Sequence, residues 1–160
     1  MFPFFVAFFS LLAIAYKCLR RKRLEIKDKI CVVTGGSNGI GLELCKQFLP
    51  FNRVVNLDIV STNSIQNKNY KFIECDVSNY EQVENAFSII RNELGKVDIL
   101  VNNAGVYTGK SLVDLKQEEI IKTLGTNLHA LFWVTQQTLP LMDKNNDGCY
   151  IINMSSCLGL

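Results

Sequence analysis

The sequence predicts an α/β fold built on a doubly wound parallel sheet. From residue 30 onward, short runs of β-branched residues alternate with amphipathic helical patterns, which is typical of βαβ units. A glycine-rich segment, residues 34–41, separates the first such run from the first helical pattern. In doubly wound sheets a nucleotide binds at this kind of turn, because the turn lies at the carboxyl end of a strand.

Five short apolar runs give the expected strands. They are residues 30–33, 54–57, 71–74, 97–101 and 150–153. The polar segment between the second and third runs, residues 61–68, is expected to be a loop with little room for a helix.

Three helical patterns connect these strands. The first covers residues 39–49 and is followed by Pro50, which cannot continue a helix. The second begins at a capping box, residues 78–81, and closes at Gly95 as a left-handed cap. The third covers residues 114–142. The apolar stripes expected to face the sheet are Ile40, Leu44 and Phe48 in the first helix, Val83, Phe87, Ile90 and Leu94 in the second, and Ile120, Leu124, Leu131 and Val134 in the third.

Residues 1–23 differ in composition from the rest of the chain. Residues 1–19 hold 16 of the 77 apolar residues and five of the ten phenylalanines, and residues 20–23 are all Arg or Lys. As a helix, the apolar stretch would be about 28 Å long, which just reaches across the hydrocarbon of a bilayer. Because the positive charge follows the apolar stretch, we expect an uncleaved anchor with the remaining chain in the cytosol. A monotopic or hairpin anchor, or a hydrophobic helix packed on the domain, are the alternatives.

The expected organisation is therefore a membrane anchor with a basic flank, residues 1–23, and a nucleotide-binding domain, residues 24–160. Residues 1–19 would contact the lipid of the endoplasmic reticulum or of a lipid droplet. The six cysteines contain no C-x-x-C pair and most lie in apolar runs, which is typical of free thiols in a reducing compartment. We expect no metal site and no nucleic-acid partner.

The glycine-rich segment predicts a dinucleotide site. A sharp turn needs residues without a Cβ, and a pyrophosphate has to approach the backbone N–H groups at a helix amino terminus closely. The alternative is a plain turn that binds nothing. The position of the glycines between an expected strand and an expected helix favours the dinucleotide site. The predicted cofactor-binding residues of this segment are Gly35, Ser37, Asn38, Gly39, Ile40 and Gly41.

Asp58 follows the second expected strand and predicts the choice of cofactor. It comes 17 residues after Gly41, close to the spacing of about 20 at which an acid meets the adenosine ribose hydroxyls. A carboxylate there repels a 2′-phosphate, and no Arg or Lys lies in the glycine-rich segment or directly after Asp58. NAD is therefore favoured over NADP. The alternative is an aspartate that only caps the turn at the end of the strand.

Three motifs at successive strand ends resemble the short-chain dehydrogenase/reductase superfamily. They are T-G-x-x-x-G-x-G at residues 34–41, Asp76-Val77, and Asn-Asn-Ala-Gly at residues 102–105. Residues 105–110 and 118–133 are most similar to membrane-anchored 17β-hydroxysteroid and epidermal retinol dehydrogenases, while residues 98–106 and 151–156 are also similar to 15-hydroxyprostaglandin dehydrogenase. The resemblance covers residues 28–160 and implies a Rossmann-type sheet, truncated after the fifth strand.

The resemblance also implies roles for residues at the ends of the third and fourth strands. Asp76 would accept a hydrogen bond from the adenine amino group, and Val77 would supply a backbone contact. Asn103, Ala104 and Gly105 would run beside the adenosine ribose.

Asn127 and Ser156 are the predicted catalytic residues. Asn127 interrupts the apolar stripe of the third helix, where an unpartnered amide would cost about 1–3 kcal/mol, so we expect a polar partner for it. The resemblance implies that its backbone holds a water that relays protons to a catalytic lysine; alternatively, the amide only bonds neighbouring backbone. Ser156 matches the family's catalytic serine, which hydrogen-bonds the alcohol or carbonyl oxygen of the substrate.

In the family, a Tyr-x-x-x-Lys pair follows that serine by a little over a dozen residues, whereas this sequence ends four residues after Ser156. The fifth strand is then expected to be an uncovered edge. One hypothesis is an NAD-dependent oxidoreductase for a small lipophilic alcohol or ketone (a steroid, retinoid or long-chain hydroxylipid) that could be a homodimer in its full-length form. The other is a membrane-anchored nucleotide-binding or interaction module. This chain alone is expected to be inactive, since a general base contributes about 10²–10⁴-fold.

Overall fold

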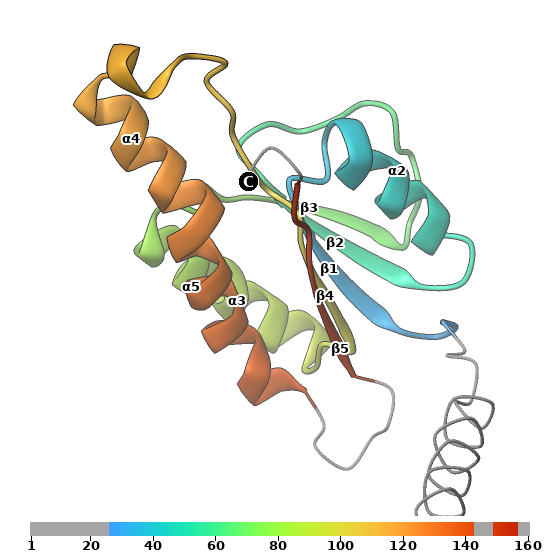
Figure 1. Ribbon diagram of the computed structural model, residues 1–160. Helices are drawn as coiled ribbons and strands as arrows, with labels where there is room; N and C mark the ends of the chain where they lie inside the picture. Colours follow the sequence, from blue (N-terminus) through green and yellow to red (C-terminus); the bar gives the residue numbers. More distant parts are fainter. Residues whose placement is uncertain (1–25, 143–148, 157–160) are drawn as a thin grey trace, which may run out of the picture.

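The computed structural model describes residues 26–142 and 149–156, which form a five-stranded parallel sheet with helices on both faces (Figure 1). The order of the strands is β3-β2-β1-β4-β5. Every pair of neighbours is parallel, so the predicted α/β class is confirmed. The strands are β1 (Ile30–Thr34), β2 (Arg53–Asp58), β3 (Tyr70–Glu74), β4 (Ile99–Asn102) and β5 (Tyr150–Asn153).

The predicted anchor, residues 1–23, lies outside the described residues. Within residues 26–142 and 149–156, no helix is both long and apolar enough to cross a membrane.

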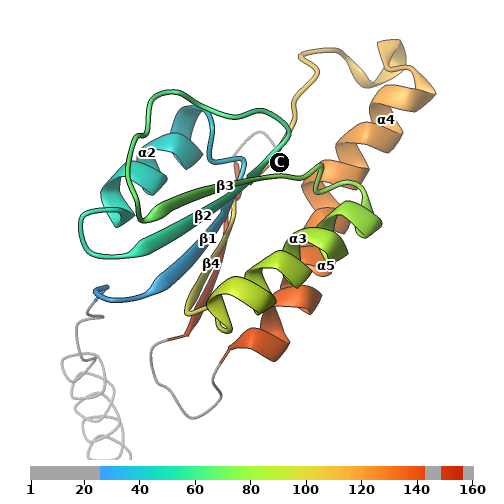
Figure 2. The same ribbon diagram turned by 180° about the vertical axis from the view of Figure 1, so that it is seen from behind.

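The helices cover the sheet in two layers (Figures 1 and 2). Helix α2 (Gly39–Phe48) lies on one face, and α3 (Tyr80–Leu94) with α5 (Ala130–Thr138) on the other. Successive strand residues point to opposite faces, so in β1 Val32 packs toward α3 while Cys31 and Val33 pack toward α2. Burial of both faces explains why these strands are continuous apolar runs.

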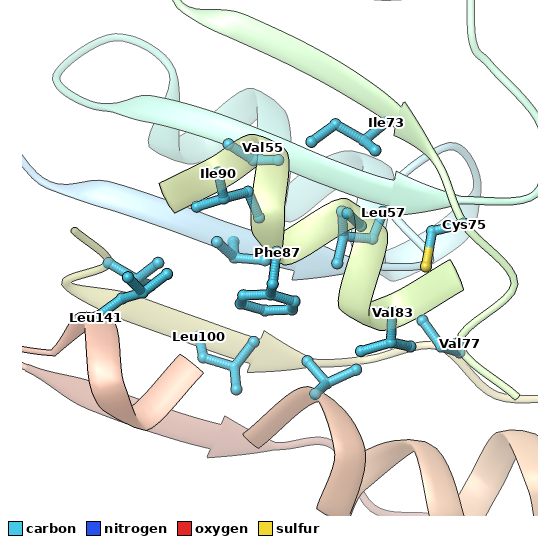
Figure 3. Packing of buried hydrophobic residues seen from close by; sticks show 14 of the residues in the cluster. Val55, Leu57, Ile73, Cys75, Val77, Val83, Phe87, Ile90, Leu100 and Leu141 are labelled. Atoms are coloured by element: carbon cyan, nitrogen blue, oxygen red, sulfur yellow. The ribbon is translucent and has the colours of Figure 1, made fainter. Parts of the chain in front are cut away.

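Phe87 of α3 lies at the centre of the larger core (Figure 3). Its ring is fully buried, between the sheet and the end of the α5 segment. The other residues of this core that Figure 3 labels are Val55, Leu57, Ile73, Cys75, Val77, Val83, Ile90, Leu100 and Leu141. The stripe predicted for this helix is therefore confirmed, with Val83 and Ile90 buried and Leu94 packed at the rim.

Helix α3 begins one residue later than its predicted capping box. Asn79 is the N-cap residue, and its side chain accepts a hydrogen bond from the backbone N of Gln82. Ser78 instead donates to the Asp76 carboxylate, which removes it from the cap. Gly95 ends the helix with φ +73°, as predicted.

The predicted helix over residues 114–142 is several elements. After a short 3₁₀ turn, η1 (Leu112–Asp114), come α4 (Gln117–Leu124), a π-helical turn η2 (Gly125–His129), α5, and a second 3₁₀ turn η3 (Leu139–Leu141). Ile120 and Leu124 are exposed, so the inward stripe predicted there is wrong for these two. The cause is that α4 runs past the carboxyl ends of the strands, where no sheet lies beneath it (Figures 1 and 2).

Two smaller expectations also need correction. Ile40 is 63% exposed, because it lies in the first turn of α2, at the rim of a hollow rather than over the sheet. Strand β4 begins at Ile99 instead of residue 97, because the Val97 N–H donates to Leu141 at the end of η3 and not to a neighbouring strand. Residues 61–68 form a loop, as predicted.

Candidate functional site

Two adjoining hollows lie along the carboxyl ends of the strands. One of about 460 Å³ follows the ends of β1, β2 and β3, and one of about 520 Å³ follows the ends of β4 and β5. They share Ile40, Asn103, Ala104, Gly105 and Val106. We call the first the glycine-loop hollow and the second the serine hollow; together they form one cleft across the sheet edge.

The turn after β1 and the first turn of α2 need glycine at several positions, among them Gly35 and Gly41. Gly35 has φ +69°, and its N–H donates to the carbonyl of Leu57 at 2.8 Å. A Cβ at Gly41 would lie 2.1 Å from the carbonyl oxygen of Gly35 and 2.5 Å from Nδ2 of Asn103. The start of α2 therefore packs directly against the turn that precedes it. This packing places the backbone N–H groups of the turn at the helix amino terminus, where a pyrophosphate could approach them closely.

Thr34 and Asn103 join the ends of β1 and β4. The Thr34 hydroxyl accepts hydrogen bonds from the backbone N of Asn103 and of Ala104, both at 2.9 Å. The Asn103 side chain donates to the carbonyls of Thr34 at 2.9 Å and Gly35 at 3.2 Å. These four bonds fix the floor that both hollows share.

Asp58 lines the glycine-loop hollow and also holds the loop in place. Its Oδ2 accepts from the backbone N of Ser37 at 2.9 Å, and its Oδ1 is 3.4 Å from the backbone N of Val60. The carboxylate thus caps the turn at the end of β2, as in the alternative interpretation, while remaining part of the cleft wall.

Ten of the twelve predicted cofactor-binding residues line the glycine-loop hollow. They are Gly35, Asn38, Gly39, Ile40, Asp58, Asp76, Val77, Asn103, Ala104 and Gly105. Ser37 and Gly41 are buried behind its wall. The Ser37 hydroxyl donates to the carbonyl of Val60, so its side chain is directed into the protein and supports the loop from within.

Sequence reasoning missed Asn56, which is 0% exposed in the middle of β2. Its Oδ1 accepts from the backbone N of Gly36 at 2.7 Å, and its Nδ2 donates to the hydroxyls of Ser37 and Tyr70, both at 2.9 Å. The signal in the sequence was an amide inside the apolar run Val-Val-Asn-Leu. Such a group needs partners, because burying it unpaired is costly.

Six further residues line the glycine-loop hollow that were not predicted to bind the cofactor: Leu57, Ile59, Cys75, Val106, Lys122 and Thr126. In the same lining, Asp76 accepts from both the backbone N and the hydroxyl of Ser78, at 2.9 and 2.7 Å, through Oδ1. Cys75 also lines this hollow. Burial raises the pKa of its thiol to about 12, so it stays protonated and is not a nucleophile at neutral pH.

Asn127 lies in the π-helical turn η2 and lines the serine hollow. Its side chain accepts from the backbone N of Val106 at 2.8 Å and donates to the carbonyl of Val106 at 2.9 Å. The expected polar partner is therefore the backbone of the loop after β4. This pairing holds η2 against that loop; the catalytic role of Asn127 stays a prediction.

Ser156 follows β5 and lines the serine hollow together with Ser155 and Met154. The strand end is held by Asn102, whose side chain donates to Oδ1 of Asn153 at 2.9 Å and whose carbonyl accepts from the backbone N of Met154 at 2.9 Å. The two predicted catalytic residues, far apart in sequence, therefore lie on the wall of one hollow.

A family model described as short chain dehydrogenase matches residues 29–160. Retinol dehydrogenase 10-B of Danio rerio is 31% identical, and the similarity covers 89% of this chain and 51% of that protein. Estradiol 17-beta-dehydrogenase 11 of Mus musculus is 31% identical over 160 residues, which cover 94% and 53%. The chain thus spans about half the length of these relatives.

Solved structures share the fold. A short chain dehydrogenase from Leptospira borgpetersenii with bound NAD+ superposes with a TM-score of 0.76 at 29% identity, covering 83% of this chain and 53% of that one. A 3-ketoacyl-(acyl-carrier-protein) reductase from Brucella melitensis complexed with NADH gives a TM-score of 0.74 at 26% identity, covering 82% and 59%. With the family model matching most of its length, this chain belongs to the short chain dehydrogenase family.

Proposed function

We propose that this chain is the cofactor-binding part of a membrane-anchored oxidoreductase that binds NAD and acts on a lipid alcohol or ketone. One observation carries the proposal. Residues predicted from four separate sequence motifs line a single cleft along the carboxyl ends of the strands. Solved relatives that contain NAD+ or NADH support a nicotinamide cofactor for this cleft.

The glycine-loop hollow fits the adenosine end of NAD. A Cβ at Gly39 would meet nothing within 4 Å, so the missing side chain there leaves the open space that a pyrophosphate needs to approach the backbone. Asp58 would accept from the ribose hydroxyls, and the second oxygen of Asp76 would accept from the adenine amino group. No Lys or Arg directly follows Asp58 in sequence to neutralise a 2′-phosphate, which favours NAD over NADP. Lys122 is the one cationic side chain among the residues that line this hollow.

The serine hollow fits the reacting end of the substrate. Its apolar lining from Ile40, Leu131 and Met154 suits a lipophilic molecule, while Ser156 would hydrogen-bond the substrate oxygen. When bound, NAD accepts or returns the hydride of the alcohol carbon. Asn127 would hold the loop after β4 in place during this step. The names of the relatives, a retinol and an estradiol dehydrogenase, favour a retinoid, steroid or similar hydroxylipid.

The predicted anchor at residues 1–23 supports a location on the endoplasmic reticulum or a lipid droplet, with the domain in the cytosol. A lipid substrate would then dissolve in the same membrane that holds the enzyme. The relatives extend over about twice the length of this chain. We therefore propose catalytic turnover, and a homodimer, only for a protein of the relatives' full length.

Calorimetry on the full chain in detergent tests the cofactor. We expect saturable binding of NAD, weaker binding of NADP, and weaker binding of NAD by Asp58→Ala. Asp114→Ala, an exposed aspartate in η1, is the matched control and should bind as wild type. No binding of NAD overturns the proposal, and equal affinity of Asp58→Ala and wild type overturns the ribose assignment.

Binding of retinol or estradiol in the presence of NAD tests the substrate side. Ser156→Ala should weaken it several-fold, because the substrate oxygen loses its partner. Ser155→Ala changes the neighbouring hydroxyl on the same wall and should leave the affinity nearly unchanged. Equal losses in the two variants would show that Ser156 is not the substrate-binding hydroxyl.

A further inference from the structure

The edge of the sheet opposite the cleft carries a set of basic residues. In a parallel sheet, all strands begin at one edge and end at the other. At the beginning of four of the five strands the chain has a lysine or arginine. These are Lys27 and Lys29 before β1, Arg53 at the first position of β2, Lys68 before β3, and Lys96 before β4. We call this set the basic edge.

The basic edge differs in charge from the rest of the described chain. Residues 26–142 and 149–156 contain 11 Lys or Arg against 12 Asp or Glu, so that part of the chain is close to neutral. Three acids stand beside the five cations of the basic edge: Asp28, Asp98, and Glu93, which lines a hollow with Arg53 and Lys68 and pairs with Lys71. Asp98 is buried, and its carboxylate is held by the Lys96 ammonium and the backbone N of Ile30. This edge therefore carries more cations than acids.

Three of these cations are available to a partner. The side chains of Lys29, Arg53 and Lys68 make no ion pair with any carboxylate in the described part of the chain. A hollow of about 360 Å³ lies between Lys29, Arg53 and Lys96, and its wall includes the aromatic ring of Phe51. The same wall includes Asp28, and Lys96 is paired with Asp98, so Lys29 and Arg53 are the cations of this hollow that could meet an anionic group.

Phe51 gives the basic edge an apolar element. Its side chain is 58% exposed in the turn before β2, and the Lys27 ammonium lies 5.6 Å from the centre of its ring. An exposed aromatic ring with cations around it is typical of surfaces at the membrane interface, where the ring meets the headgroup region and the cations meet phosphates.

We propose that the basic edge docks on the anionic phospholipid surface of a membrane. The described chain begins at Ile26, four residues before β1, and enters the domain at this edge (Figures 1 and 2). The predicted anchor ends at residue 23. A chain that leaves the bilayer there brings the basic edge, and not the cleft, to the headgroups. Clustered Lys and Arg next to a membrane attachment bind anionic lipids by charge.

Docking gives the domain a fixed orientation. The cleft lies at the opposite edge of the sheet, so NAD reaches it from the solvent side. The inference rests on the membrane anchor of the proposed function, but it does not depend on the cofactor or the substrate proposed there.

Lysine footprinting on the full chain tests this orientation. The protein is reconstituted into nanodiscs of phosphatidylcholine, alone or mixed with phosphatidylserine, and the acetylation of each lysine is followed by mass spectrometry. We expect phosphatidylserine to slow acetylation of Lys29 and Lys68 several-fold, and salt to reverse this. Lys116 and Lys122, on α4 beyond the other edge, should react at the same rate in both discs. Equal rates for Lys29 in the two discs, or equal slowing of both groups, overturn the proposal.

A pair of charge reversals completes the test. Arg53→Glu should abolish the protection of Lys29 by phosphatidylserine, whereas Lys116→Glu, an exposed lysine away from the basic edge, should leave it unchanged. Circular dichroism checks that both variants fold. Unchanged protection in folded Arg53→Glu overturns the proposal. Binding of NAD in the same samples reports separately on the cofactor cleft, and protection by an added oligonucleotide instead of the anionic lipid would assign the edge to nucleic acid and also overturn it.

Discussion

The side chain of Asn56 accepts a hydrogen bond from the backbone N of Gly36 at 2.7 Å. A buried amide on β2 therefore holds the glycine-rich turn after β1 from behind. The same side chain donates to the hydroxyls of Ser37 and Tyr70. Both the oxygen and the nitrogen of the Asn56 amide therefore have hydrogen-bond partners. The shape of the glycine-rich turn after β1 thus depends on Asn56, which does not line the cleft.

Replacing Asn56 with alanine should lower both stability and affinity for NAD. The Gly36 N–H and the Ser37 hydroxyl lose a buried partner, which costs about 1–3 kcal/mol, and the loop loses its fixed shape. Urea unfolding followed by Trp133 fluorescence measures the first effect, and calorimetry with NAD the second. Tyr70→Phe removes only the hydroxyl that accepts from Asn56 on the side away from the glycine-rich turn, so it should give a smaller loss of stability and of affinity for NAD.

Asn52→Ala is the matched control for this change. Asn52 is also buried and also makes three hydrogen bonds, to the backbone of Lys29, Ile26 and Phe48, but it lies before β2, at the opposite end of the strand. We expect a similar loss of stability with no loss of affinity for NAD. If the two variants weaken NAD binding equally, Asn56 does not position the loop.

Gly41→Ala should abolish NAD binding while the sheet stays folded. Its Cβ would lie 2.1 Å from the carbonyl oxygen of Gly35, so the turn has to move away from the start of α2. Gly95→Ala is a suitable control. The φ of +73° at Gly95 also favours glycine, but a Cβ there would meet nothing within 4 Å, so no neighbouring segment has to move. The control should cost about 1 kcal/mol of stability and leave calorimetric NAD binding intact. Wild-type affinity in Gly41→Ala would contradict the packing described here.

The sequence was sufficient for the sheet and for most of the cleft because these depend on local patterns. The apolar run at β1 and the glycines after it predict a strand and a turn from neighbouring residues alone. Asn56 could not be assigned in this way, since its partners Ser37 and Tyr70 come from other elements. The π-helical turn η2, which begins at Gly125, could not be predicted either, because the apolar pattern of the sequence continues through it. A Cβ at Gly125 would lie 3.2 Å from Ser78, and this contact between distant residues is seen only in the folded structure.

Phe87→Ala should be among the most destabilising core substitutions. The ring is fully buried at the contact of α3 with the sheet, and removing it leaves a cavity that costs about 3–5 kcal/mol. Phe132→Ala removes the same side chain from α5 at a position that is 67% exposed, and should change stability by less than about 0.5 kcal/mol. Urea unfolding compares the two. Similar losses would mean that Phe132 is covered in solution.

Alkaline pH should unfold the protein through its buried thiols. Burial raises the pKa of Cys31, Cys45 and Cys75 from 9.0 to about 12. Because the folded pKa is the higher one, the contribution of each thiol to stability is complete below pH 9 and is lost as the pH rises from 9 toward 12. Each loses up to about 1.4 kcal/mol per pH unit in that window. Unfolding free energies measured at a series of pH values check the slope.

Other groups also titrate above pH 9, so the thiol contribution is isolated by comparison with Cys75→Ala. This variant is less stable at pH 7, because it leaves a small cavity beside Val77 in the main core. Its stability should nevertheless fall less steeply between pH 9 and 12 than that of the wild type, because one buried thiol no longer ionises on unfolding. Parallel curves for the two proteins would contradict a raised pKa at Cys75. Reaction of the native protein with a thiol reagent at pH 8 gives an independent measure, since Cys75 should react only after unfolding.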